Sequence, residues 1–414
     1  MSERIYGLLG AHLGHSFSPA IHARLGNDAY RLFELPEDAL EGFLRQEGLG
    51  GVNVTIPYKQ AVLPLVDECS PAVQAIGAAN TIFRKDGKLC AENTDVPGFR
   101  YMAERSGIPI EGRKVLVLGN GGASRAVVEG LRQLGAETVL IVSRGGGDLP
   151  LVSYDDLPDH YDADVLVNTT PVGMYPGNLE TPLDLTPFSN LSGVLDIIYN
   201  PLRTGLLMQA EALGLPFENG LSMLVAQAVR AHECFFDTTV DDAVIETILR
   251  DLTREVTNLV LIGMPGSGKS TVARLLAERT GREVLELDDA IEAATGRTIP
   301  QIFAEEGEEG FRRYESEQIL RAGSRSGVIL SLGGGAVTRA ENYLPLHQNG
   351  RIYCLTRDLA QLATDGRPLS KDPETLKAME AVRAPLYEQF RDRTVPNDRT
   401  PEEAAEAILA DFNA

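Results

Sequence analysis

The chain has 414 residues, which at roughly 100 to 200 residues per domain predicts two to four domains, and its composition, 43% hydrophobic and 23% charged, is that of a globular protein. A formal charge of −21 and the lack of any basic run exclude a nucleic-acid-binding surface, and no apolar stretch of about 18 residues predicts a membrane span. The N-terminus lacks the basic and apolar regions of a signal peptide, so a cytoplasmic location is expected.

Apolar β-branched runs alternate with amphipathic helical stretches, the pattern of parallel sheets covered by helices. The first block, residues 1–100, contains the strand candidates IYGLLG and GVNVTI. The second, residues 101–220, includes a strand, a glycine turn and a helix in KVLVLGNGGASRAVVEGLRQLG. Helical segments at about 221–250 are expected to return to the first block. Residues 251–257 are the predicted linker to a third block, 258–414.

Three polar clusters interrupt the apolar segments of the first block: residues 15–19, 53–59 and 93–95. They offer hydroxyls, an amide, an ammonium and a carboxylate, groups suited to binding a small polyhydroxylated acid. Each cluster taken singly is also explained by helix caps, turns and a surface lysine. Their combination with the segment GAANT, residues 77–81, favours a binding site.

A glycine turn, GNGGA, follows the strand KVLVL directly and opens a helix. Such a turn lets the backbone approach a pyrophosphate, and the helix N-terminus offers free N–H groups and a partial positive charge. Ser124 stands at the third glycine position of the dinucleotide fingerprint, and a turn of this kind can also be structural. Arg144 stands where an NAD enzyme has a ribose-binding acid and fits a 2′-phosphate, although a solvated arginine at a strand end is the alternative.

Residues 4–245 resemble the shikimate dehydrogenase family through HSFSP, NVTIPYK, GAANT, NTD, GNGGASRA, NTTPVGM and NGLSMLVAQA, in that order. The resemblance implies an α/β substrate-binding domain and a Rossmann NADP-binding domain, with Lys59 and Asp95 as the catalytic pair. The implied substrate contacts are Ser16, Ser18, Asn53, Thr55, Asn80, Asp95, Tyr199 and Gln227. The implied cofactor contacts are Gly119, Gly121, Gly122, Ala123, Arg144 and Met223.

The chemistry of ketone reduction agrees with this pair. Hydride transfer develops negative charge on the ketone oxygen, so a lysine ammonium beside a carboxylate can supply the proton. The cofactor side departs mildly from the family, which often has a further arginine, because Arg144 leads into three glycines here. A weaker preference for NADP over NAD is therefore expected.

The third block opens with GMPGSGKS, residues 263–270, a complete GxxxxGK[ST] pattern between the strand NLVLI and a helix. Backbone N–H groups of such a loop hold phosphates, Lys269 reaches their outer oxygens and the Ser270 hydroxyl binds Mg²⁺. The predicted nucleotide contacts are Gly263, Gly266, Ser267, Gly268, Lys269, Ser270 and Thr271. GTPases, ATPases and small-molecule kinases all use this loop, so it does not identify the phosphoryl acceptor.

From about residue 258 the chain resembles the shikimate kinase family through LELDDAIE, GEEGFRRYE, SLGGGAV, GRPLS and RAPLYE. The resemblance implies a P-loop α/β kinase domain in which Arg367 acts on the phosphates and Glu286 joins Ser270 at Mg²⁺. The implied shikimate contacts are Asp288, Arg312, Gly333, Gly334, Gly335 and Arg383. Glu286 replaces the family's aspartate, and the segment before Arg367 is short and lacks an upstream arginine, so slow phosphoryl transfer is expected.

Together the resemblances imply that one chain reduces 3-dehydroshikimate to shikimate with NADPH and phosphorylates shikimate with ATP and Mg²⁺. One alternative is a quinate or shikimate oxidoreductase that uses NAD(P) and has a degenerate kinase domain. Another is a non-catalytic pathway sensor, which the retained Lys59 and Lys269 disfavour. The expected partners are small-molecule substrates, while the oligomeric state and any direct passage of shikimate between the sites stay open.

Overall fold

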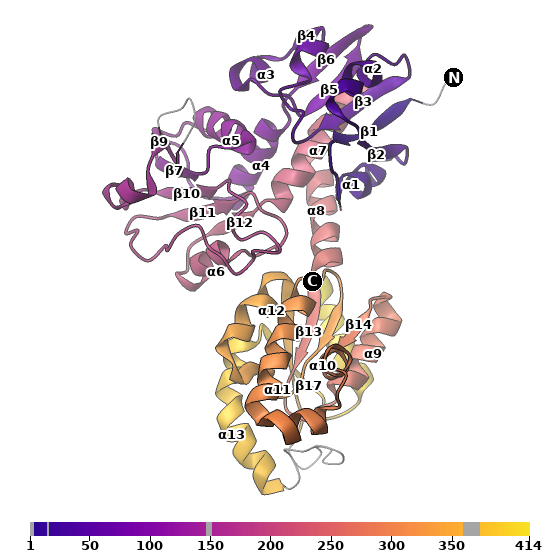
Figure 1. Cartoon of the computed structure of the whole chain (residues 1–414), viewed down its shortest axis with the longest axis vertical. Coiled ribbons are helices and arrows are strands. Elements are labelled where there is room, and N and C mark those ends of the chain that lie inside the picture. Colours follow the sequence, from indigo (N-terminus) through magenta and orange to yellow (C-terminus); the bar gives the residue numbers. More distant parts are fainter. Residues whose placement is uncertain (1–3, 15, 146–150, 359–372) are drawn as a thin grey trace. The chain divides into compact units, whose positions relative to one another are not determined.

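The computed structural model describes residues 4–14, 16–145, 151–358 and 373–414. Over these ranges the chain forms two compact units, and Figure 1 labels most of their elements. The first unit contains two β-sheets and comprises Met1–Val172, Thr181–Tyr199 and Leu206–Arg250. The second contains a third sheet and comprises Gly173–Glu180, Asn200–Gly205 and Asp251–Ala414.

The first sheet is mixed and has the strand order β2-β1-β3-β5-β6-β4. Its strands are β1 (Ile5–Gly10), β2 (Tyr30–Glu34), β3 (Leu49–Val54), β4 (Glu68–Cys69), β5 (Thr81–Lys85) and β6 (Lys88–Glu92). β1 pairs in parallel with β2 and β3, whereas β5 runs antiparallel to β3 and β6. Asp86 and Gly87 join β5 to β6 with φ angles of 51° and 80°, as an Asp-Gly hairpin turn requires.

Three short helices accompany this sheet: α1 (Ser18–Arg24), α2 (Leu40–Leu44) and α3 (Pro71–Ile76). Leu40 and Leu44 of α2 pack with Leu9 of β1 and Val52 of β3 in one buried core. The later helix α7 (Leu221–Phe236) also contacts α1, β3 and β5. This part of the unit therefore combines segments from the start of the chain with one from beyond the second sheet.

The second sheet is parallel throughout, with the order β12-β11-β10-β7-β8-β9. Its strands are β7 (Lys114–Leu118), β8 (Thr138–Val142), β9 (Leu151–Val152), β10 (Val165–Asn168), β11 (Gly193–Asp196) and β12 (Phe217–Asn219). Successive residues of β7 face opposite sides of the sheet, because Val115 packs in one buried core and Leu116 in another. The first core includes α4 (Asp95–Ser106) and α5 (Gly122–Gln133), and the second includes α6 (Gly205–Ala212). Apolar residues on both faces explain the continuous hydrophobic strands of the sequence.

The third sheet is also parallel, with the order β14-β15-β13-β16-β17. Its strands are β13 (Asn258–Ile262), β14 (Val284–Glu286), β15 (Ile329–Ser331), β16 (Gly350–Thr356) and β17 (Arg393–Pro396). Its helices are α9 (Lys269–Thr280), α10 (Leu287–Thr295), α11 (Ile299–Gly323), α12 (Tyr343–Asn349), α13 (Pro373–Phe390) and α14 (Pro401–Asn413). Val260 of β13 packs toward α10 and α11, and Leu261 packs toward α9 and α14. Alternate residues of one central strand thus form the cores on both sides of the sheet.

The boundary between the two units falls inside a helix. α8 runs without a break over Asp242–Val256, and the units separate between Arg250 and Asp251. Residues 251–256 of the expected linker are therefore helical, and β13 begins at Asn258. Within the described ranges, every helix is too short or too polar to span a bilayer.

Candidate active sites

A cavity of about 250 Å³ in the first unit, called here the first cavity, is lined mainly by polar side chains. It brings together ten of the residues that the sequence singles out: Ser16, Ser18, Asn53, Thr55, Lys59, Asn80, Asp95, Tyr199, Met223 and Gln227. They come from segments that lie more than two hundred residues apart in the chain. Met223, expected near the cofactor, lies in the wall of this same cavity.

Lys59 and Asp95 form an ion pair in the first cavity. Lys59 Nζ lies 2.6 Å from Asp95 Oδ2, and the two side chains are 22% and 13% exposed. Asn80 Nδ2 donates to Asp95 Oδ1 at 2.9 Å, while the side-chain carbonyl oxygen of Asn80 accepts from the Thr94 backbone N–H at 2.7 Å. Asp95 is also the first residue of α4, where the helix dipole favours a carboxylate. Both carboxylate oxygens are engaged, so the orientation of the ammonium group is well defined.

A buried layer fixes Asn53 in the wall of the first cavity. The Tyr30 hydroxyl donates to Asn53 Oδ1 at 2.8 Å, and Asn53 Nδ2 donates to Thr81 Oγ1 at 3.2 Å. His22, which is fully buried, stacks on Tyr30 with ring centroids 4.0 Å apart. Burial raises the pKa of Tyr199, which keeps its phenol a neutral hydrogen-bond donor. The wall can therefore present fixed polar groups to the hydroxyls of a small ligand.

The glycine turn leaves room for a phosphate at the start of α5. Gly121 is the residue before the helix, and among the described residues, chain neighbours and the helix's own backbone aside, no atom lies within 4 Å of a Cβ added at Gly121 or Gly122. The first N–H groups of a helix have no partner within the helix, so such a space suits a phosphate. Arg144 is exposed and lies two residues after β8. Burial raises the pKa of the Tyr154 phenol, and the charge of Arg144 partly opposes this effect. The turn and the arginine fit a dinucleotide with a 2′-phosphate.

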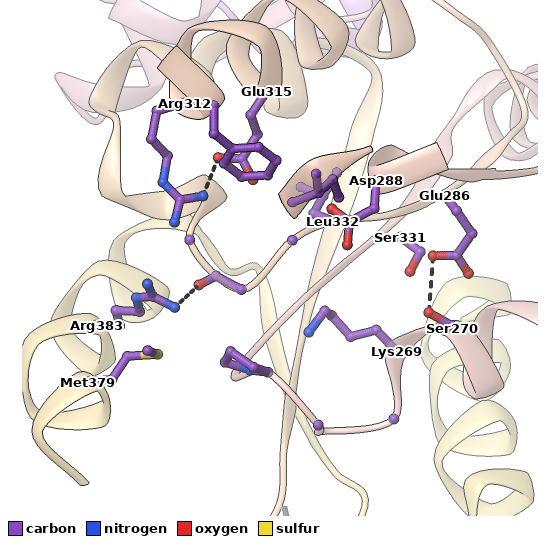
Figure 2. A pocket seen from close by; sticks show the side chains of 18 of the residues that line it. Lys269, Ser270, Glu286, Asp288, Arg312, Glu315, Ser331, Leu332, Met379 and Arg383 are labelled. Atoms are coloured by element: carbon purple, nitrogen blue, oxygen red, sulfur yellow. Dashed lines mark hydrogen bonds and ion pairs between the residues drawn. The ribbon is translucent and has the colours of Figure 1, made fainter. Parts of the chain in front are cut away.

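A second cavity, of about 410 Å³, lies in the second unit at the P-loop and is called here the P-loop cavity. Figure 2 shows Arg312 and Arg383 on one side of it and Ser270 and Glu286 on the other, with Lys269 between them. The predicted residues that line it are Gly266, Gly268, Lys269, Ser270, Thr271, Glu286, Asp288, Arg312, Gly333, Gly334, Gly335 and Arg383. Arg367 and the short segment before it lie outside the described residues.

Two predicted nucleotide contacts lie behind the wall of the P-loop cavity. The Gly263 carbonyl accepts a hydrogen bond of 2.8 Å from Lys269 Nζ, and Ser267 is fully buried. Ser267 is tied to the end of β17, because Asn397 Nδ2 donates to its carbonyl oxygen at 2.7 Å. Gly268 has a φ of 93°, and a Cβ there would lie 2.4 Å from Asn397 Nδ2, so this position requires glycine.

The oxygens of Ser270 and Glu286 face one another, with Ser270 Oγ 3.1 Å from Glu286 Oε2. A hydroxyl and a carboxylate are suitable ligands for Mg²⁺, which takes its remaining ligands from phosphate and water. Among the described residues no group of three His, Cys, Asp or Glu side chains forms a candidate metal site. The pair fits a magnesium ion whose other ligands are nucleotide phosphate and water.

The opposite side of the P-loop cavity is built to bind an anion. Arg312 is buried, and its Nη1 donates to Glu315 Oε2 at 2.7 Å. A side chain at Gly335 would place its Cβ 2.0 Å from Arg312 Nη2, so the guanidinium can reach this position only beside glycine. Arg383 Nη1 donates to the Gly334 carbonyl at 3.1 Å. Two guanidinium groups at one wall match the carboxylate of a small acid.

The sequence did not single out two residues that hold these arginines. Glu315 is fully buried, and its burial raises the pKa of its carboxyl to about 7 against the opposing effect of Arg312. The Tyr387 hydroxyl donates to the Gly334 carbonyl at 2.6 Å. The sequence did contain a signal for Glu315, because an acid three residues after an arginine on a helix can pair with it. No local sequence signal reveals the second.

Asp288 lies beside the P-loop lysine in the same cavity. Burial by the surrounding protein raises the pKa of its carboxyl, while the charge of Lys269 opposes that effect. A carboxylate with a raised pKa accepts a proton more readily than an ordinary one. The position of Asp288 and its raised pKa therefore suit it to accept a hydrogen bond or a proton from a hydroxyl group.

Comparisons with known proteins assign both parts of the chain. The family model of the shikimate dehydrogenase substrate binding domain matches residues 8–82, and the shikimate kinase model matches residues 265–413. A shikimate dehydrogenase (NADP(+)) from Clostridium perfringens is 38% identical over 266 residues, which are 60% of this chain and 98% of the relative.

Solved structures of shikimate dehydrogenases are similar to the N-terminal part of this chain. A chorismate mutase/shikimate 5-dehydrogenase fusion protein from Clostridium acetobutylicum is 36% identical, with a TM-score of 0.58, over 61% of this chain and 97% of that one. Shikimate 5-dehydrogenase from Thermus thermophilus, in complex with NADP(H) and shikimate, is 35% identical, with a TM-score of 0.54. The match covers 60% of this chain and 99% of that one. The chain therefore belongs to the shikimate dehydrogenase family and carries a shikimate kinase domain in its C-terminal part.

Proposed function

We propose that the protein reduces 3-dehydroshikimate to shikimate with NADPH and phosphorylates the 3-hydroxyl of shikimate with ATP and Mg²⁺. The observation that carries the first activity is the ion pair of Lys59 with Asp95 inside the first cavity. The second rests on the P-loop cavity, in which the nucleotide loop and a wall with two arginines share one space. We assign substrate binding to residues 1–100 with about 221–250, NADP binding to 101–220 and the kinase to 258–414.

Lys59 is the proposed proton donor for the ketone. NADPH, when bound, supplies the hydride, so negative charge develops on the ketone oxygen. The Lys59 ammonium neutralises that charge and delivers a proton to the oxygen, and Asp95 orients the lysine through the 2.6 Å ion pair. Asn80 in turn orients Asp95 through its 2.9 Å hydrogen bond. Asn53, Ser16 and Ser18 are proposed to hold the hydroxyls and the carboxylate of the substrate.

The cofactor contacts follow from the space at the glycine turn. The N–H groups at the start of α5 are proposed to bind the pyrophosphate, and Arg144 the 2′-phosphate. The Thermus relative is in complex with NADP(H), which supports this choice of dinucleotide. A guanidinium without an acid at the end of β8 favours NADP over NAD.

In the kinase domain, ATP supplies the phosphoryl group and the protein supplies position and charge. Arg312 and Arg383 are proposed to hold the shikimate carboxylate, which directs the ring toward Asp288. Asp288 accepts the proton of the attacking hydroxyl, helped by its raised pKa. Lys269 stabilises the charge of the transferring phosphoryl group, and Ser270 and Glu286 would hold a magnesium ion, which would add positive charge there.

Initial rates with four pairs of substrates test the dehydrogenase assignment. Shikimate and quinate are each offered with NADP⁺ and with NAD⁺, and kcat/KM is expected to be highest for shikimate with NADP⁺. A preference for quinate with NAD⁺ would support the alternative oxidoreductase instead. Because none of the four pairs involves ATP, this result is independent of the kinase.

The kinase assignment is tested by shikimate-dependent formation of ADP, with shikimate 3-phosphate quantified by mass spectrometry. The proposal expects both products in equal amounts and only in the presence of Mg²⁺. If the protein binds shikimate and ATP but neither domain shows turnover, the result supports a non-catalytic sensor and contradicts the proposal.

A further inference from the structure

Arg357 is a cation in the wall of the P-loop cavity to which neither the sequence motifs nor the proposed mechanism gives a role. It follows directly after β16, at the same end of the sheet as the P-loop. Within the described residues its side chain makes no hydrogen bond or ion pair, and its Nε is buried. A guanidinium has five N–H donors, and the donors that the protein does not use are available to a ligand that supplies acceptors.

The backbone on both sides of Arg357 is fixed relative to the P-loop. The carbonyl of Thr356 accepts from the Asn397 backbone N–H at 2.8 Å, and the backbone N–H of Asp358 donates to Asp398 Oδ1 at 2.9 Å. Asn397 also donates to the Ser267 carbonyl in the P-loop at 2.7 Å. Arg357 therefore extends from a position that the end of β17 ties to the nucleotide loop.

The other cationic side chains of this wall already have partners in the protein. Arg312 is paired with Glu315, and Arg383 donates to the Gly334 carbonyl. Lys269 donates to two carbonyl oxygens of the P-loop, at 2.8 and 3.0 Å. Among the described lining residues, Arg357 is the cation whose charge no protein acceptor engages.

We propose that Arg357 binds a phosphate of the nucleotide in the P-loop cavity. The protein carries a net charge of −21, whose field repels a polyanion, so nucleotide affinity depends on local cations. A guanidinium fork matches phosphate oxygens and forms strong charge-assisted hydrogen bonds. The proposal rests on the kinase function and adds a phosphate-binding residue outside the P-loop itself.

The test compares Arg357→Gln with Arg351→Gln in the full-length protein. Arg351 lies at the opposite end of β16 and pairs with Asp411 at 2.7 Å, so it controls for the loss of an arginine from the same strand. Calorimetry measures Mg·ATP and inorganic tripolyphosphate, with saturating NADP⁺ present to occupy the dinucleotide site. Arg357→Gln is expected to weaken both ligands about tenfold or more, the effect of losing a hydrogen bond between charged groups. Arg357→Lys is expected to recover part of the loss, and Arg351→Gln to bind like the wild type.

Two results would overturn the proposal. Equal affinities of Arg357→Gln and Arg351→Gln for Mg·ATP would show that Arg357 does not contact the nucleotide. A loss for Mg·ATP with unchanged tripolyphosphate affinity would place Arg357 on the base instead. If the wild type binds Mg·ATP but forms no shikimate 3-phosphate, the kinase proposal fails, while the affinity comparison still decides the role of Arg357.

Discussion

Lowering the pH is expected to destabilise the substrate-binding part of the first unit through His22. This histidine is fully buried and stacks on Tyr30 at 4.0 Å. Burial, with a smaller contribution from the nearby His232, lowers the pKa of His22 from 6.5 to about 3. An unfolded chain binds a proton at this residue below pH 6.5, whereas the folded chain does so only near pH 3. The stability contributed by the neutral histidine is therefore present above pH 6.5 and is lost as the pH falls toward 3.

The size of this loss follows from the two pKa values. Each pH unit between them changes the free energy of unfolding by about 1.4 kcal/mol. At pH 4.5, two units below the unfolded value, the wild type should have lost about 2.7 kcal/mol through this residue. His22→Phe keeps a ring against Tyr30 but does not titrate, so its stability should fall less steeply over the same range. Any cost of fitting the larger ring is independent of pH and does not affect the slope.

Hydrogen exchange in urea, followed by mass spectrometry on peptides from α1 and β2, measures this slope separately from unfolding of the kinase domain. Tyr30→Phe is the matched control, because it removes the hydroxyl at the same stack but leaves His22 to titrate. Its slope should equal that of the wild type. Equal slopes for the wild type and His22→Phe between pH 6.5 and 4.5 would show that His22 does not cause the loss of stability.

Three further substitutions have defined outcomes. Lys59→Ala should lower the dehydrogenase kcat by about 10²-fold or more with a much smaller change in substrate affinity, since an acid–base group is lost; a kcat within a few-fold of wild type would exclude Lys59 as the acid. Arg144→Ala should raise KM for NADPH and leave that for NADH nearly unchanged in steady-state assays; equal changes would exclude a 2′-phosphate contact. Glu315→Gln should raise the kinase KM for shikimate about tenfold and hardly change that for ATP, because Arg312 loses the carboxyl group that orients it at 2.7 Å and keeps only the more exposed Glu308; an unchanged shikimate KM would show that Arg312 needs no such support.

Local sequence patterns were sufficient to predict the two nucleotide loops. A glycine turn or P-loop lies directly between a strand and a helix, so strand, loop and helix are read from adjacent residues. The structure has β7 before the turn at Gly119 and β13 before the P-loop, each followed by its helix. The parallel order of these two sheets also agrees with the alternation of strands and helices in the sequence.

The pairing of distant groups could not be predicted from spacing. Lys59 and Asp95 are 36 residues apart, and they were linked only by a family resemblance. Their contact depends on the mixed first sheet, in which β3 and β5 are neighbours and the β5–β6 hairpin returns the chain to α4. The Asp86-Gly87 dipeptide is a known hairpin signal and would have predicted that β5 and β6 are adjacent and antiparallel.

Buried supporting residues were the least predictable part of the sites. Glu315 lay inside a quoted motif, yet a carboxylate beside an arginine on a helix is more often a solvent-exposed pair. Only the structure shows that it is fully buried next to Gly333, whose missing side chain leaves space for its carboxylate. Such roles depend on burial, which a single sequence does not report directly.

A coupled incubation shows whether one chain performs the two successive reactions. The full-length protein receives 3-dehydroshikimate, NADPH and Mg·ATP, and both shikimate and shikimate 3-phosphate are quantified over time. The wild type should form both products, Lys59→Ala should form almost none of either, and Lys269→Ala should accumulate shikimate without its 3-phosphate. Formation of the 3-phosphate by Lys269→Ala would show that the P-loop lysine is not needed for phosphoryl transfer, and shikimate as the only product of the wild type would show that the chain does not perform the second reaction.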